Sequence, residues 1–135
     1  MNFDVTTIRL FLHVLAATVW VGGQIVLAGL VPTLRNISPD APKAAAQQFN
    51  KIAWPAFGLA MITGIWNLAE INVGDRSTGY HGALMVKLLI VALSGVAAFL
   101  HSHAKTNTGK AIWGALTGLS ALAALLFGII LQTSA

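Results

Sequence analysis

Residues 8–31 read IRLFLHVLAATVWVGGQIVLAGLV. This run is apolar except for a few polar side chains, and it is longer than the roughly 20 residues that a helix needs to cross the hydrocarbon core of a bilayer. Three further apolar runs follow, at residues 52–69, 82–101 and 111–131. We therefore predict an all-α fold, an integral membrane four-helix bundle whose spans use nearly the whole chain.

Composition supports a membrane environment. Hydrophobic residues make up 56% of the chain and charged residues 9%, compared with about 25% charged residues in an ordinary soluble domain. The formal net charge is +4, but the basic residues lie in the connections between apolar runs instead of clustering on one face, which argues against a nucleic-acid partner. Cysteine is absent, so disulfides, thiolate metal sites and cysteine nucleophiles are excluded.

The positions of the basic residues predict the orientation of the spans. Cytoplasmic connections carry an excess of Lys and Arg. We expect the first and third connections to be cytoplasmic and both termini to lie on the outer side of a cell inner (cytoplasmic) membrane. The first and third connections carry five basic residues and the opposite side carries three: Arg35, Lys43, Lys51, Lys105 and Lys110 against Arg9, Arg76 and Lys87.

Prolines occur at the end of the first apolar run and inside the second expected helix. The first run extends from about residue 8 to residue 31 and stops at Pro32. In the connection 33–51, the turn residues 38–42 are followed by a helical stretch, so the second helix should begin early and run along the interface before its span. Pro55 should then bend it.

Polar side chains within the spans show which face of each helix is interior, because in lipid such groups turn toward other helices. The polar or small residues recur at helical spacing, which places each set on one face. In the fourth span, Gly114 and Gly118 form a GxxxG pattern, which indicates close packing within the bundle or between protomers. The sets are His13, Ala17, Trp20 and Gln24 in the first span, Thr63, Asn67 and Glu70 with Trp66 in the second, and Lys87, Ser94 and His101 in the third.

His13 and Lys87 are the ionisable residues deepest in the outer half of the spans. At 1.5 Å per residue, each lies roughly 8 Å from the outer end of its span, so we expect them to share a leaflet and a pocket, with His81 and Glu70 at its rim. A neutral imidazole can ligate haem iron, copper or zinc, which makes His13 and His81 candidate metal ligands. The alternatives are a histidine that only bonds a neighbouring helix and a lysine that snorkels to the interface.

Other chemistry finds less support. His101 and His103 lie near the cytoplasmic end of the third span, where they form either a second, inner site or a hydrated helix end. The methionines are isolated, so the paired thioethers of a copper(I) pathway are missing. No triad-like set lies at one depth and no phosphate-binding loop is present, which leaves hydrolase and nucleotide-binding functions without support.

Three stretches, in order, resemble a known family. Residues 12–23, LHVLAATVWVGG, place a histidine seven residues before a tryptophan that is followed by glycines. Residues 49–53, then Thr63 and Gly64, come next, and residues 78–88, TGYHGALMVKL, lead into a helix with a lysine. This order is similar to the copper resistance D (CopD) domain, a family that is itself similar to membrane protoporphyrinogen oxidases of the HemJ type. On this resemblance, residues 1–135 form a single four-span CopD-like domain.

The resemblance implies a site. His13 would be the ligand of a metal or of haem b, Trp20 would line the pocket, and Lys87 would be the polar or charged partner of the cofactor. The expected function is a CopD-like inner-membrane protein that binds haem or copper near the outer leaflet, in metal homeostasis or electron transfer. Two alternatives remain: an accessory or assembly subunit of a larger, respiratory membrane complex without its own cofactor, and a HemJ-like haem-dependent oxidoreductase. A bundle this small is also expected to form a homo-oligomer or to join a larger complex.

Overall fold

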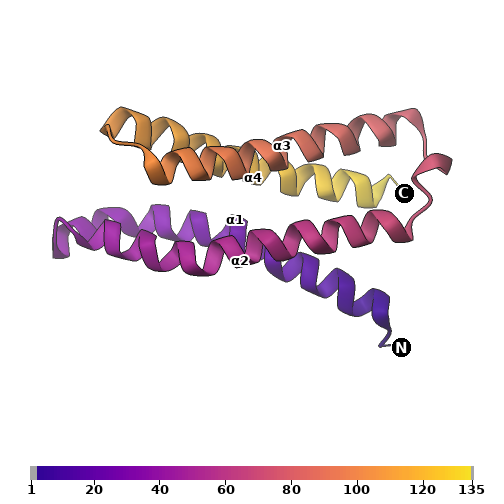
Figure 1. The fold of residues 1–135 in the computed structure, drawn as a ribbon, viewed down its shortest axis with the longest axis horizontal. Helices are drawn as coiled ribbons and strands as arrows, with labels where there is room; N and C mark the ends of the chain where they lie inside the picture. Colours follow the sequence, from indigo (N-terminus) through magenta and orange to yellow (C-terminus); the bar gives the residue numbers. More distant parts are fainter. Residues whose placement is uncertain (1–2, 135) are drawn as a thin grey trace. The chain divides into compact units, whose positions relative to one another are not determined.

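The computed structural model of the protein describes residues 3–134 and places them in four long helices with short connections (Figure 1). The described residues contain no strand. Each of the four helices is long and apolar enough to cross a membrane, with a mean hydropathy of 1.4 to 2.4 over its most apolar window. The prediction of an all-α protein with four membrane-spanning helices is therefore confirmed. In chain order, the elements are α1 (Val5–Ile37), α2 (Ala41–Glu70), the short 3₁₀ helix η1 (Val73–Asp75), α3 (Thr78–His103) and α4 (Asn107–Thr133).

The first helix extends beyond the apolar run from which it was predicted. α1 continues through Pro32 and ends at Ile37. An interior proline removes one backbone hydrogen bond, and membrane helices tolerate that loss. The helix ends instead before Pro39, because a proline disfavours the helical conformation of the residue that precedes it, and Ser38 is extended. The early start predicted for the second helix is confirmed, since α2 begins at Ala41.

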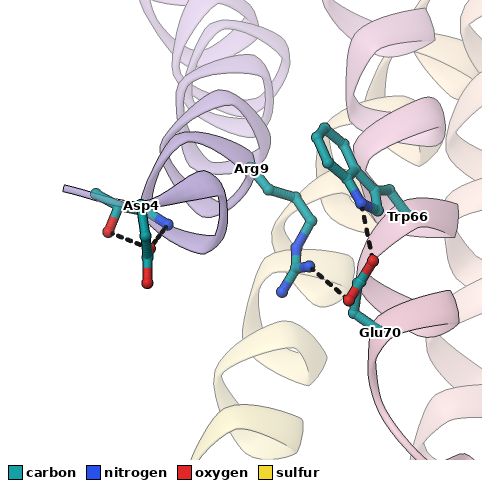
Figure 2. Close-up of polar contacts among 5 residues, drawn as sticks. Asp4, Arg9, Trp66 and Glu70 are labelled. Atoms are coloured by element: carbon teal, nitrogen blue, oxygen red, sulfur yellow. Dashed lines mark hydrogen bonds and ion pairs between the residues drawn. The ribbon is translucent and has the colours of Figure 1, made fainter. Parts of the chain in front are cut away.

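Short polar side chains cap three of the four helices at their N-termini. Asp4 accepts a hydrogen bond from the backbone N–H of Thr7 at 2.9 Å at the start of α1 (Figure 2). Ser77 accepts from the N–H of Tyr80 at the start of α3. Thr106 accepts from the N–H of Gly109 at the start of α4. Each cap satisfies one of the backbone donors that a helix start leaves without an intrahelical partner.

α1 and α2 pack along each other as an antiparallel hairpin, one of two compact units of the chain (Figure 1). Its core contains the small residues Ala16 and Ala53, each 1% exposed, which let the two backbones approach. Gly23 of α1 makes room for an aromatic ring of α2. A Cβ atom placed there would lie 2.4 Å from Cε2 of Phe49, so the Phe49 ring occupies the space that the missing side chain leaves.

α3 and α4 form the second hairpin, which is the other compact unit. Small residues again line the contact, because Ala97 and Ala121 are 0% and 2% exposed. The buried hydroxyl of Ser94 donates to the backbone carbonyl of Thr117 at 3.4 Å, which links the two helices by a polar contact within the apolar span. Both hairpins therefore associate through small residues and a few polar links, the pattern expected where lipid, not water, surrounds the helices.

Large apolar side chains face outward along all four helices. Phe11, Leu89 and Leu119 are each more than 60% exposed, and they are typical of a long series of exposed Leu, Ile and Val side chains. Only 11% to 22% of the residues in the most apolar window of each helix are buried. Such a surface is unfavourable in water and suits the hydrocarbon core of a bilayer.

We expect Gly23→Ala to destabilise the first hairpin by about 1–3 kcal/mol, because the new methyl group overlaps the Phe49 ring and forces it to move. Gly22→Ala is the matched control, since a Cβ atom at Gly22 has no neighbour within 4 Å. Unfolding of both variants in a mixed-micelle titration measures the difference. Equal stabilities would show that the ring of Phe49 does not occupy this space.

The Asp4 cap should weaken in acid. The pKa of the Asp4 carboxyl lies below its usual value of 3.8, chiefly because the Thr7 backbone N–H donates to it. A lowered pKa in the folded state means that the cap stabilises α1 fully above pH 3.8 and that this contribution is lost as the pH falls through the lowered pKa.

Hydrogen exchange at the Thr7 amide, compared between about pH 6 and about pH 2 after correction for intrinsic rates, measures this loss. The protection should fall in the native protein and should stay unchanged in Asp4→Asn, whose amide oxygen accepts a hydrogen bond but does not titrate. An equal fall in both proteins would assign the effect to another group.

Candidate functional site

Polar side chains of α1 and α2 face each other along the half of the first hairpin that lies away from its turn. Because the helices are antiparallel, residues near the start of α1 meet residues near the end of α2. Arg9 lies against Glu70, and one turn further along α1, His13 lies against Thr63. The faces that the polar spacing predicted, His13 on the first helix and Thr63 with Glu70 on the second, are thus turned toward each other.

The imidazole of His13 is held by α2. Its Nδ1 atom lies 3.1 Å from the carbonyl oxygen of Ala60 and 2.9 Å from the hydroxyl oxygen of Thr63. The Thr63 hydroxyl lies 2.7 Å from the Leu59 carbonyl oxygen, to which it donates. A carbonyl oxygen can only accept, so Nδ1 must carry the proton to bond Ala60. The neutral ring is then the Nδ1–H tautomer, and its basic lone pair is on Nε2.

Gly64 lies beside the imidazole. A Cβ atom at Gly64 would be 3.4 Å from Cε1 of His13, which is an ordinary van der Waals contact. Gly64 is also the residue four positions after Ala60, whose carbonyl it flanks on the helix surface. The missing side chain therefore exposes this carbonyl to a donor from α1.

The second hairpin repeats this arrangement at the opposite end of its helices. His101 of α3 donates from Nδ1 to the carbonyl oxygen of Lys110 at 2.7 Å. Gly114, four positions after Lys110, makes room for the ring, because a Cβ atom there would be 3.1 Å from both Cε1 and Nδ1 of His101. The Gly114 half of the GxxxG pattern thus serves packing within the hairpin. His13 differs from His101 in its additional contact with a buried hydroxyl, that of Thr63.

Trp20 lies on the same face of α1 as His13 and is 6% exposed. Its ring packs against two aromatic rings of α2, with centroids 5.4 Å from Trp54 and 4.6 Å from Phe57. Both distances are within the range of favourable aromatic pairs. Trp20 therefore helps to hold the two helices together two turns below His13.

Arg9 is a residue whose role the sequence analysis missed, because it was counted only as a charge at the end of a span. In the structure it is 7% exposed and lies one turn from His13 on the interior face of α1. Its Nη1 atom is 3.8 Å from a carboxylate oxygen of Glu70, and its guanidinium lies 5.9 Å from the centre of the Trp66 ring (Figure 2). The four-residue spacing from Arg9 to His13 is the signal that would have placed it in the interior.

The other predicted site residues belong to the second hairpin. The Lys87 side chain extends over α4, since a Cβ atom at Gly128 would lie 3.2 Å from its Nζ atom. His81 is exposed and donates from Nε2 to the backbone carbonyl of Val73 at 2.6 Å, which ties the start of α3 to η1. Lys87 lies six positions after His81 in α3, so the two side chains leave the helix about 120° apart.

Within residues 3–134, no group of three or more His, Asp or Glu side chains is placed to hold a metal ion. No protein-family model, no curated protein and no solved structure matches the chain. The CopD-like assignment therefore rests on the motifs of the sequence.

The tautomer of His13 can be tested by ¹⁵N NMR of histidine-labelled protein. We expect the Nδ1–H form, with an unprotonated Nε2 resonance that disappears in His13→Gln. Thr63→Val should leave the tautomer unchanged, because the Ala60 carbonyl still accepts, and it should lower the free energy of unfolding by about 0.6 kcal/mol, the average for a hydrogen bond between membrane helices. An Nε2–H form would contradict the assignment.

Proposed function

We propose that the first hairpin binds a cofactor, haem b or copper, through Nε2 of His13. The observation that carries the proposal is the double contact of the opposite ring nitrogen, Nδ1, with the Ala60 carbonyl and the Thr63 hydroxyl. Histidines that ligate metals almost always donate their other ring N–H to such a group, which fixes the tautomer and the orientation of the ring. The local chemistry of His13 therefore fits a ligand to iron or copper.

A single imidazole favours haem over a copper centre built from several side chains. Haem iron needs only one or two axial ligands from the protein, because the porphyrin supplies the other four nitrogens. Copper bound by this hairpin would need further donors besides His13. When bound, haem would supply one-electron redox chemistry, and the protein would hold the iron ligand in place and exclude water with the packed aromatic rings around Trp20.

Lys87 supplies the second part of the proposal. Its ammonium lies within an apolar span, and the only acidic residue in the chain from residue 72 onward is Asp75, which binds the side chain of Asn72. A charged group within a membrane span is costly unless an opposite charge compensates it. On the CopD resemblance, Lys87 would compensate the carboxylates of the cofactor, and the protein would work near the outer leaflet of the inner membrane in metal homeostasis or electron transfer.

The accessory-subunit alternative makes a different claim about the same residues. In that case His13 only joins two helices, as His101 does in the second hairpin, and the exposed faces bind the larger subunits of a membrane complex. Each of the two histidines contacts a backbone carbonyl of the neighbouring helix and lies beside a glycine. Substituting each in turn therefore distinguishes a cofactor ligand from a residue that only links two helices.

We expect the detergent-purified protein to show a b-type haem spectrum, or bound copper by metal analysis, and His13→Ala to lose it. Truncation removes the only nitrogen proposed to reach the metal, so occupancy should fall at least about tenfold. His101→Ala is the matched control and should keep full occupancy. Circular dichroism checks that both variants remain helical.

Full occupancy in His13→Ala would overturn the ligand assignment. A wild-type spectrum without haem bands, in a sample without copper, would overturn the proposal as a whole and favour the accessory-subunit function, which copurification with larger subunits at fixed stoichiometry would then support.

A further inference from the structure

Arg9 is a buried cation that its surroundings do not satisfy. Its side chain is 9% exposed, although it carries a charge that does not titrate in proteins. A buried charge is costly unless it is paired and its N–H groups are hydrogen-bonded. Its place at the start of an apolar span adds to this cost, because the lipid chains beside it offer no hydrogen-bond partners.

The guanidinium has five N–H donors but few acceptors. Within residues 3–134, its one ion pair is the contact of Nη1 with Glu70, and at 3.8 Å this is longer than a hydrogen bond. The Nε atom is buried and has no hydrogen-bond partner. The face of the Trp66 ring attracts the positive charge of the guanidinium, but it does not accept a hydrogen bond in the guanidinium plane.

Glu70 is poorly placed to neutralise Arg9. Its side chain is 55% exposed, so water screens the pair, and its other oxygen accepts a hydrogen bond from the Trp66 indole N–H at 3.3 Å. One turn away on the same face of α2, the Oδ1 atom of Asn67 is also buried without a partner. This end of the first hairpin thus contains two buried polar atoms without a hydrogen-bond partner, Nε of Arg9 and Oδ1 of Asn67.

We propose that Arg9 binds an anionic phosphate group at the outer end of the first hairpin. The planar fork of arginine matches two oxygens of a phosphate, and such bonds are shorter and stronger than neutral ones. The ligand would accept from the Nη atoms, which the 3.8 Å contact with Glu70 leaves without a hydrogen bond. The indole ring of Trp66 would keep its cation–π contact with the guanidinium while the ligand is bound.

The position of Arg9 identifies the more suitable source of the phosphate. Arg9 is the fifth residue of α1 and directly follows Ile8, where the apolar run begins. Its neighbours Leu10 and Phe11 are 41% and 62% exposed, so acyl chains can cover them. A phosphate at this level corresponds to the headgroup of a phospholipid. Free inorganic phosphate offers the same chemistry, and the experiment distinguishes the two.

The test uses the full chain in a neutral detergent and two probes, dihexanoyl phosphatidic acid and inorganic phosphate, each titrated calorimetrically. Arg9→Gln should weaken binding at least about tenfold, because it removes a charge-assisted bidentate contact. The matched control is Arg76→Gln, since Arg76 also lies over an aromatic ring, 5.3 Å from the centre of Tyr80, but is less buried. The titration measures phosphate binding alone, so its outcome does not depend on the cofactor that the first hairpin is proposed to bind.

Glu70→Gln distinguishes a binding site from a structural ion pair. If Arg9 exists to pair with Glu70, loss of the carboxylate only destabilises the hairpin and leaves binding unchanged. If Arg9 holds a phosphate, removal of the competing negative charge should tighten binding, by about two- to fivefold for a partly screened pair. Should Arg9→Gln fail to fold, Glu70→Gln alone decides between these outcomes.

Binding of phosphatidic acid without measurable binding of inorganic phosphate would support the proposal with a lipid headgroup as the ligand. Similar affinities for both probes would support it with a free anion as the ligand. Three results would overturn it: no binding of either probe, equal loss in Arg76→Gln and Arg9→Gln, or unchanged or weaker binding in Glu70→Gln.

Discussion

The close contact between α1 and α2 is the interaction on which the polar features of the first hairpin depend. The two helices pack closely because small residues lie between them: Ala16, Ala53 and Gly23. Because the two helices lie so close together, an imidazole on one helix can reach a main-chain carbonyl on the other. In a bilayer, no water competes for that carbonyl, so the helix contact and the orientation of His13 stabilise each other.

A glycine four residues after the acceptor accompanies this contact in both hairpins. The carbonyl of a helical residue already accepts the N–H four positions later, and its second lone pair points outward beside that residue. A Cβ atom at Gly114 would lie 3.1 Å from the His101 ring, which is tight, whereas one at Gly64 would lie 3.4 Å from the His13 ring, which is an ordinary contact. The polar link of the second hairpin therefore depends on its glycine more than the link of the first.

Much of the fold was predictable, because length and hydropathy identify membrane spans and because the polar residues recur at helical spacing. The facing of His13 toward the Thr63 side of α2 followed from that spacing. The acceptor of its hydrogen bond did not, because every residue has a backbone carbonyl and composition does not mark the one that is exposed. Arg9 was misjudged because a charge near the end of a span is normally a topology signal, and only its contacts reveal it as interior. The apolar run stops at Pro32, but α1 continues to Ile37, because membrane helices tolerate the hydrogen bond that a proline removes.

The two interior prolines of the first hairpin, Pro32 and Pro55, both lie between the turn and the level at which His13 meets Thr63. Each proline removes one backbone hydrogen bond from its helix and leaves one carbonyl, that of Ala28 or Lys51, without its usual donor. The half of the hairpin that carries the turn is consequently the more compliant half. When the bilayer thins or thickens, that half can flex to follow it, while the half that holds the imidazole keeps an uninterrupted series of backbone hydrogen bonds and a constant shape.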